Sequence, residues 1–476
     1  MPKSNNSLFF VVTTLMVFCA GISGASSLSI ENDYRVRGIL FTNNDFDNAT
    51  STDTLSYYSQ RLNLTLKGKF NEGVEICTRI SAIGVVGSTT PFMGIVSSTN
   101  TAAYPSYPST SFVPYINYAY VKINNAGNTP LNIVAGKQPL SYGSGLIVDD
   151  NGIGMMAMRF YGKYVIPIPI PKFRFKRSSG PFFDYFDFPI ETEIFTATPQ
   201  DSLRPGYDRD IYGLVNRIDR DKYHMEFSIF QESDGSGSNY IKGSDSYSTN
   251  SINKYFYDIF IERREAISIV KFELAIEKGT VKDINGEKIS LDGLGYTVFG
   301  ELIGENTKLG KVSAHAQLAF FTGDKNPTMY SDDGSFNPTY TKRYDGLERF
   351  GYGELFAASP YDAQFPLPIG SYFSGIDTLN LGIDFSPLYG WNLGVNYYYF
   401  SSTEGPTGAP AASGFERLYG AQYALGVEMD LYVKFTHSKY TETRFSYCRY
   451  TPPTHIGFWP KNEPATRYQL EMSAKF

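Results

Sequence analysis

The chain has 476 residues, with 42 Lys and Arg against 48 Asp and Glu, so its net charge is -6 at neutral pH. This acidic balance excludes a general nucleic-acid partner, which requires a basic surface. The 37 Tyr and 36 Phe, against 2 Trp, together with 44 Gly, favour one large β structure with aromatic faces and tight turns over two or three ordinary soluble domains.

Residues 1–25 have the pattern of a secretory signal peptide. Lys3 precedes an apolar run over 8–20, and Ser23 and Ala25 are the small residues that a cleavage site near Ala25 needs. A retained anchor is the alternative, but the run is shorter than the roughly 20 residues that span a bilayer. We expect cleavage, which leaves residues 26–476 as a single domain. Cys77 and Cys448 then remain, too few for a disulfide framework.

A hairpin over 57–84 carries the clearest strand pattern. Leu62, Leu64 and Leu66 alternate with polar residues, "NEG" makes a turn, and the alternation resumes at Val74. Both strands exceed the 5–6 residues usual in soluble sheets, whereas a strand that crosses a membrane needs about 9–11 residues. No segment after the signal is long and apolar enough for a membrane helix, so the pattern predicts a transmembrane β-barrel.

The same alternation predicts eighteen strands, joined by connections that alternate between short and long. Short turns on one side and long loops on the other are typical of an antiparallel outer-membrane barrel with periplasmic turns and extracellular loops, so we expect the bacterial outer membrane as its location. The predicted strands are 31–41, 57–70, 74–84, 113–123, 131–138, 155–164, 189–197, 209–218, 222–230, 254–262, 267–278, 294–304, 311–321, 378–386, 391–401, 419–435, 442–450 and 465–476.

Two segments fit this pattern badly. Residues 165–188 fall on the side of the short turns but are long and rich in Pro, so we expect a solvated periplasmic loop there, or a count that slips by one hairpin. Residues 322–377 contain no convincing strand, and we expect this long loop to fold back into the mouth of the barrel.

The last residues continue the alternation to the end of the chain. Tyr468, Leu470, Met472 and Phe476 share one face of the final strand, and an apolar strand that ends this way needs a partner at its edge. We expect the last strand to pair with the first. Phe476 also resembles the terminal signal that the barrel-assembly machinery reads, so this machinery is an expected partner.

Charged residues at alternate positions are expected to face a water-filled lumen, because a Lys or Arg in the lipid midplane costs about 2–4 kcal/mol. We therefore predict a basic wall and an acidic wall of opposite sign. The predicted basic residues are Arg35, Arg37, Arg61, Lys67, Lys69, Arg79, Lys122, Lys137 and Arg159, and the predicted acidic residues are Glu273, Glu277, Glu301, Glu305, Asp384 and Glu428.

No catalytic or metal motif is found. His224, His315, His437 and His455 are far apart in sequence and show no ligand spacing. The oxygen-rich stretch 332–337 lacks the pattern of a calcium loop, so turn formation is the favoured interpretation. We therefore expect no enzyme, no cofactor and no metal site.

Three stretches resemble the alginate-export family of outer-membrane barrels, namely "LNIVAGKQPLSYGSG" (131–145), "AFFTGDKNPTMYSDDGSFNPTY" (319–340) and "ALGVEMDLYVKF" (424–435). This resemblance implies a monomeric eighteen-stranded barrel with a polar, charged lumen that passes a polysaccharide or another solute. The residues that carry it are Gly136, Lys137, Gln138, Tyr142, Gly143, Gly323, Asp324, Gly426, Glu428 and Asp430.

The sequence thus predicts a porin-like channel in outer-membrane lipid for a polar or charged solute, with no nucleic-acid partner. Two alternatives stay open at this stage. One is a barrel that transports nothing and acts through its long loops as an adhesin or structural surface protein. The other is a secreted pair of soluble β-sandwiches.

Overall fold

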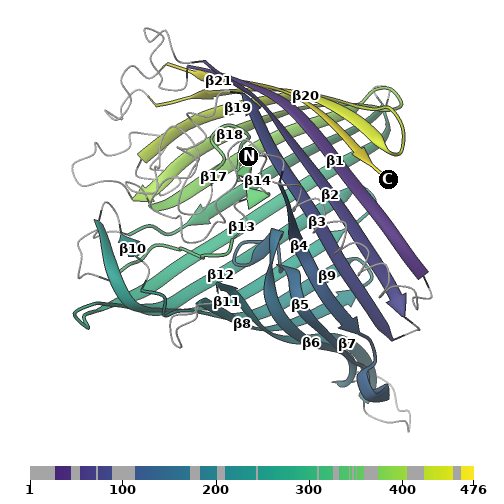
Figure 1. Cartoon of the computed structure of the whole chain (residues 1–476), viewed down its shortest axis with the longest axis vertical. Coiled ribbons are helices and arrows are strands. Elements are labelled where there is room, and N and C mark those ends of the chain that lie inside the picture. The colour runs from purple at the N-terminus through teal and green to yellow at the C-terminus, as the bar shows by residue number, and fades with distance from the viewer. Residues whose placement is uncertain are drawn as a thin grey trace, which may run out of the picture.

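The structure, a computed structural model, is a slanted barrel of long strands (Figure 1). No helix among the described residues is long and apolar enough to cross a membrane. The predicted signal peptide lies outside the described residues. These are 27–43, 54–70, 73–87, 113–171, 183–200, 209–237, 239–242, 245–307, 310–324, 332–341, 344–345, 348–349, 351–358, 374–404, 423–453 and 463–476.

Eighteen antiparallel strands form the wall, each paired with its neighbours along the chain, which confirms the predicted fold. The strands are β1 (Ser27–Thr42), β2 (Leu55–Phe70), β3 (Val74–Gly87), β4 (Val113–Ile123), β5 (Leu131–Ser141), β6 (Asp149–Pro171), β7 (Phe183–Gln200), β8 (Arg209–Arg220), β9 (Tyr223–Asp234), β11 (Asp245–Arg264), β12 (Ser268–Asp283), β13 (Lys288–Thr307), β14 (Gly310–Phe321), β17 (Ser374–Ser386), β18 (Trp391–Glu404), β19 (Tyr423–Thr436), β20 (Thr441–Thr451) and β21 (Ala465–Lys475).

Four short elements lie outside this wall. β10 (Asn239–Lys242) pairs only with β11, and β15 (Tyr344–Asp345) pairs with β16 (Glu348–Arg349). A single turn of 3-10 helix, η1 (Ala126–Asn128), lies in the connection between β4 and β5.

The barrel closes between β1 and β21, as the C-terminal pattern predicts. Their register runs from Asp33 opposite Lys475 to Thr42 opposite Thr466. The backbone of Phe476 extends the ladder by two hydrogen bonds with Asn32. Closure pairs the first strand with the last, so the sheet has no open edge between β1 and β21.

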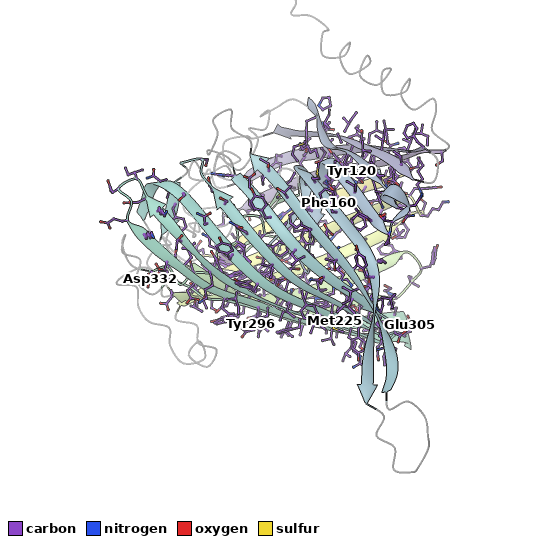
Figure 2. The ribbon with its side chains drawn as sticks, turned by 90° about the horizontal axis from the view of Figure 1, so that it is seen from below. Tyr120, Phe160, Met225, Tyr296, Glu305 and Asp332 are labelled. Carbon is purple, nitrogen blue, oxygen red and sulfur yellow. The ribbon has the colours of Figure 1, made fainter. Side chains whose placement is uncertain are left out.

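Side chains alternate between the two surfaces of the wall (Figure 2). On β21, Leu470 and Met472 are 52% and 59% exposed on the outer surface, whereas Gln469 and Ser473, which flank this pair, are buried inside. Phe160 of β6 is likewise exposed on the outside. The outer surface is therefore apolar and the inner surface polar, as a barrel in lipid requires.

The segment 165–188 is not a loop over most of its length, which corrects the expectation from its prolines. β6 and β7 stay paired as far as Pro171 opposite Phe183, and this hairpin projects beyond the other strands (Figure 2). β5 pairs with β6 only as far as Gly162, so β6 has a free edge beyond that residue. Proline has no N–H group to donate. At the alternate positions 167, 169 and 171 this lack falls on the free edge, so the prolines do not interrupt the hydrogen bonds between β6 and β7.

Three segments at the end of the barrel with long loops lie against its inner surface. Residues 142–148 and 332–341 contribute Val148 and Phe336 to a buried apolar cluster with the wall residues Phe230 and Phe256. Residues 351–358 fill a second cluster on the opposite wall. Its members from 351–358 are Leu355, Phe356 and Ala358, which pack with Ile39, Phe41, Tyr57, Ile376, Phe400, Leu425, Cys448, Tyr450 and Ala465.

Candidate functional site

The candidate site is the inner surface of the barrel, where nearly all the predicted charged residues lie. Eight of the nine predicted basic residues occupy inward positions: Arg35, Arg37, Arg61, Lys67, Lys69, Arg79, Lys122 and Arg159. Lys137 is the exception. It pairs laterally with Ala119 and Met156, both exposed on the outer surface, and its Nζ donates to the carbonyl of Ile116 at 3.0 Å.

The outward position of Lys137 corrects the sequence prediction. Its neighbours Val134 and Gln138 are the buried, inward residues of β5, and Gln138 Nε2 donates to the carbonyl of Ala157 at 3.0 Å. Both faces of β5 carry apolar residues, so the alternation of this strand does not say which face is inside. Lys137 therefore does not line the lumen.

More carboxylates lie beside the basic residues of this wall than the sequence predicts. Glu31 of β1 lies 2.7 Å from Lys67 Nζ, and Asp33 of the same strand lies 3.5 Å from Arg61 Nη2. Glu471 of β21 lies 3.7 Å from Arg37 Nε. These ion pairs form only because the barrel brings distant strands together.

Two basic residues of this wall have no carboxylate within 4 Å in the described part of the chain. Arg79 places its guanidinium 4.7 Å from the centre of the Tyr118 ring and donates to Thr65 Oγ1 at 3.0 Å. Lys122 Nζ lies 5.9 Å from the centre of the Tyr161 ring. A cation over an aromatic face keeps its charge available to a ligand.

The acidic residues of the opposite wall mostly do not face water, contrary to expectation. Glu273, Glu277 and Glu428 are at most 1% exposed, because backbone amides of the in-folded segments cover them. Ser144 N donates to Glu273 at 3.0 Å, Asn337 N to Glu277 at 2.7 Å, and Leu355 N to Glu428 at 2.7 Å. These carboxylates anchor the segments.

The other three predicted acidic residues are less covered. Glu301 occupies an inward position on β13 and is half-buried, and Glu305 is exposed near the end of that strand (Figure 2). Asp384 accepts a hydrogen bond from Tyr432 Oη and lies 3.5 Å from His315 Nδ1. These three residues are the members of the predicted acidic set that are not fully buried.

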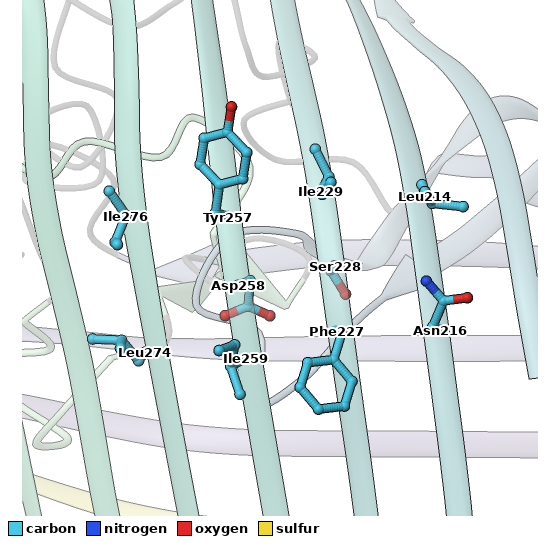
Figure 3. Close-up of a pocket in the computed structure, with 10 residues that line it drawn as sticks. All are labelled: Leu214, Asn216, Phe227, Ser228, Ile229, Tyr257, Asp258, Ile259, Leu274 and Ile276. Atoms are coloured by element: carbon cyan, nitrogen blue, oxygen red, sulfur yellow. The ribbon is translucent and has the colours of Figure 1, made fainter. Parts of the chain in front are cut away.

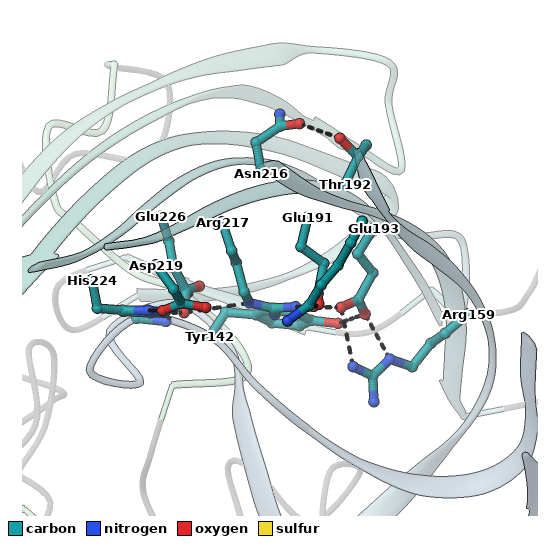
Figure 4. A network of polar contacts seen from close by, with 12 residues as sticks. Tyr142, Arg159, Glu191, Thr192, Glu193, Asn216, Arg217, Asp219, His224 and Glu226 are labelled. Atoms are coloured by element: carbon teal, nitrogen blue, oxygen red, sulfur yellow. Dashed lines mark hydrogen bonds and ion pairs between the residues drawn. The ribbon is translucent and has the colours of Figure 1, made fainter. Parts of the chain in front are cut away.

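A chain of ion pairs runs along the inner surface from β6 to β9 (Figure 4). Glu193, fully buried, accepts from Arg159 Nε at 2.6 Å and from Arg217 Nη1 at 2.7 Å. Arg217 Nε also lies 3.5 Å from Glu226, which His224 Nε2 contacts at 2.8 Å. Each buried charge therefore has at least one partner of opposite sign.

Tyr142 connects this chain of ion pairs to the first in-folded segment. Its phenol donates to Glu193 at 2.7 Å, and its ring stacks on Phe195 with the centroids 5.1 Å apart. Burial and the nearby Glu193 carboxylate raise the pKa of Tyr142 well above its ordinary value, so the phenol stays a donor. The guanidinium of Arg217 lies 5.3 Å from the ring centre.

The residues of the first and third motifs are anchor points. Gly143 adopts a φ of +57°, and a Cβ there would lie 2.4 Å from Glu273 Oε1, so only glycine permits this approach. Glu428 and Asp430 accept the amides of 354–356. Of the remaining motif residues, Gly136 and Gly426 have positive φ angles, and Gly323 and Asp324 are buried where β14 ends.

A hollow of about 260 Å³ lies on the outer surface across β8, β9, β11 and β12 (Figure 3). Its rim is made by exposed apolar side chains, among them Leu214, Phe227, Tyr257 and Ile259. Asn216, at its edge, is paired with Thr192 Oγ1 at 2.9 Å. Ser228 and Asp258 also line the hollow, but most of its lining is apolar and therefore suited to hydrocarbon.

Several residues that organise the inner surface are not among the predicted site residues. Glu193, Arg217, Glu226, Glu354 and Arg444 each take part in ion pairs or loop anchoring. Alternation places all but Glu354 on the polar face of a strand, and this signal was in the sequence. Their partners come from other strands or from a loop, which alternation does not show.

Comparisons with known proteins agree on the fold. No family model matches the chain, and no curated protein matches it. OccK9 (OpdG) of Pseudomonas aeruginosa matches with 9% identity and a TM-score of 0.50, over 95% of this chain and 99% of that chain. OccK2 (OpdF) of the same organism, in complex with glucuronate, matches with 11% identity and a TM-score of 0.50, over 95% and 98%.

The chain therefore shares the closed 18-strand barrel fold of outer-membrane porins. The outer membrane protein OpdK from P. aeruginosa is also matched, at 11% identity over 94% of this chain and 99% of that chain, with a TM-score of 0.48. Membership of the alginate-export family is not shown by these comparisons.

Proposed function

We propose that the protein is an outer-membrane channel for small polar solutes, with a preference for anions. The observation that carries this proposal is the pair of inward cations, Arg79 and Lys122, which no carboxylate within 4 Å neutralises in the described part of the chain. A charge facing the inside of a membrane barrel requires water around it. A water-filled path lined by such cations attracts anions.

The in-folded segments favour a small solute over a polymer. Residues 142–148, 332–341 and 351–358 all lie inside the barrel, and backbone amides of these segments donate to glutamate side chains of the wall. They narrow the lumen of a barrel that would otherwise be wide. Export of a polysaccharide, which the resemblance to the alginate-export family implies, is the second candidate, and it requires these segments to move aside.

The outer surface and the end of the chain bear on the location and assembly of the barrel. The apolar outer surface fits outer-membrane lipid, and the exposed aromatic end of β21 fits recognition by the barrel-assembly machinery. We favour a monomer. A barrel that transports nothing and acts as an adhesin or structural protein is the competing function.

Ion selectivity in planar bilayers tests the proposal. In a KCl gradient, the reversal potential of the wild type should show an anion preference, and Arg79→Gln with Lys122→Gln should move it toward cations. Lys137→Gln is the control for position, because it removes one positive charge from the outer surface instead of from the lumen. Glucuronate, the ligand of the OccK2 structure, should block the current more than glucose does.

Two results would contradict the proposal. A folded barrel that passes no current favours the non-transporting alternative. A reversal potential that is unchanged in the double variant shows that these two cations do not line the conducting path.

A further inference from the structure

A cluster of three side chains lies inside the barrel away from the proposed anion path. Glu428 and Asp430 of β19 and Cys448 of β20 are each at most 1% exposed. Asp430 and Cys448 lie directly opposite each other across the two strands. One ligand atom from each of the three residues lies within 4.8 Å of the other two.

The segment 351–358 covers this cluster and adds a fourth side chain. Glu354 N donates to Asp430 Oδ2 at 3.2 Å, and Phe356 N donates to Glu428 Oε2 at 2.8 Å. The Glu354 carboxylate itself turns to β20, where its Oε2 lies 3.5 Å from Cys448 Sγ. Oxygen and sulfur atoms from two strands therefore converge beneath the in-folded segment, and the Glu354 carboxylate of that segment lies beside Cys448.

One oxygen of the cluster lacks a donor. Asp430 Oδ1 is buried and accepts no hydrogen bond in the described part of the chain, although Oδ2 of the same carboxylate does. A buried carboxylate oxygen without a donor is unfavourable unless a cation or a proton occupies its lone pairs. This atom therefore points to a ligand within the cluster.

The net charge of the cluster and its neighbours is also negative, which favours a bound cation. Arg444 donates to the Glu354 carboxylate, and Arg467 donates to the Glu354 carbonyl and to Gln469. Three carboxylates thus face two guanidiniums. The net charge of these five groups is therefore -1. A divalent cation together with a Cys448 thiolate would bring this net charge to zero, and so would a single proton shared between Glu428 and Asp430.

We propose that Glu428, Asp430 and Cys448 form a site for a divalent metal ion of the zinc type, with the Glu354 carboxylate beside it. Zn²⁺ accepts thiolate and carboxylate together, usually with four ligands. Ca²⁺ and Mg²⁺ take oxygen ligands and disfavour the thiol. Binding releases the Cys448 thiol proton to solvent. The bound ion joins β19 and β20 to the segment 351–358 and holds this segment inside the barrel.

Co²⁺, which replaces Zn²⁺ and absorbs light, provides the test. The full-length protein, folded in detergent and stripped with a chelator, is titrated with Co²⁺ alone. We expect one Co²⁺ per chain, a near-ultraviolet charge-transfer band from thiolate, and displacement by Zn²⁺. Cys448→Ser should abolish that band, and Asp430→Asn should lower Zn²⁺ affinity by more than the roughly 10–100-fold that changes outside a ligand shell cause.

Cys77→Ser is the matched control, because Cys77 is also a buried, unpaired cysteine of the wall but lies on β3. It should leave the band and the stoichiometry unchanged. Absence of stoichiometric Co²⁺ binding overturns the proposal and assigns the buried charge to a shared proton. A band that persists in Cys448→Ser, or that disappears in Cys77→Ser, overturns it as well. These outcomes do not depend on whether the barrel conducts ions.

Discussion

Asn32 and Phe476 exchange two backbone hydrogen bonds, Asn32 N to Phe476 O at 2.6 Å and Phe476 N to Asn32 O at 3.0 Å. These bonds extend the ladder that joins β21 to β1, so the last residue of the chain takes part in closing the barrel. The Phe476 side chain is 65% exposed on the outer surface, on the same face as Met472. Its backbone and its side chain therefore have separate roles.

Phe476→Asp should lower the yield of folded barrel, because it removes the terminal aromatic and places a charge on the outer surface. The thermodynamic cost of a charge near the membrane interface is only about 0–1 kcal/mol, so a large loss of yield indicates failed assembly. Heat-modifiable migration on gels measures the folded fraction. Phe476→Tyr is the control and should fold normally, and normal folding of Phe476→Asp would refute the prediction.

Glu273→Ala should release residues 142–148 from the wall, because it removes the acceptor of Ser144 N and Ser144 Oγ. Leaving a buried donor without its acceptor costs about 1–3 kcal/mol. We expect a larger and noisier single-channel current. Glu301→Ala is the control, since Glu301 lies on the same wall without a hydrogen bond to the described parts of the in-folded segments; equal currents in the two variants would contradict this anchoring role.

The segment 351–358 should detach from the wall only when the pH falls below the ordinary pKa of a glutamate. Burial alone would raise the pKa of Glu354, but Arg444 and Arg467 outweigh it and hold this pKa below its ordinary value. The stabilisation is therefore present above the unfolded pKa, about 4.3, and is lost as the pH falls through the lower folded pKa. Conductance should stay constant from pH 7 to about 5 and change below about 4.

Glu354→Gln supplies the comparison for this pH dependence. At neutral pH this variant should show the conductance that the wild type shows only in acid, because the neutral amide forms no ion pair with Arg444. Wild-type conductance that changes between pH 7 and 5 would assign the effect to another group.

Charge reversal at single positions should separate free cations from paired ones. Arg79→Glu should shift the reversal potential toward cations more than Arg61→Glu or Lys67→Glu, since Asp33 and Glu31 already offset the charges of Arg61 and Lys67. Block by glucuronate should weaken in the same order. Equal shifts in all three variants would mean that the ion pairs do not reduce the field in the lumen.

Arg217→Met should destabilise the barrel more than Tyr142→Phe. Arg217 pairs with Glu193 and Glu226, and removing one partner of a buried ion pair costs about 3–5 kcal/mol. Tyr142→Phe loses one hydrogen bond, about 1 kcal/mol, and keeps the stack on Phe195. Unfolding temperatures in detergent measure both variants, and a larger loss for Tyr142→Phe would show that the aromatic contact outweighs the ion pairs.

The sequence by itself determined the number of strands, their order and the closure of the barrel. Side chains on a strand alternate with a period of two, so the faces of β2, β3 and β21 can be assigned from local pattern alone. The alternation could not show which face of a strand points inward where both faces carry similar residues. β5 has apolar residues on each side, and Lys137 was therefore assigned to the wrong surface. The prolines of β6 concealed a strand that continues along a free edge.

Only the tertiary structure decided which inward charges meet water. Glu273 and Glu301 have the same alternation and the same charge, yet Glu273 is buried under Ser144, and Glu301 is half-buried without such a cover. Lys67 and Arg79 are both inward cations, but only Lys67 has a carboxylate within 4 Å among the described residues. These differences depend on segments that return to the barrel from distant parts of the chain, and an alternation pattern carries no information about such contacts.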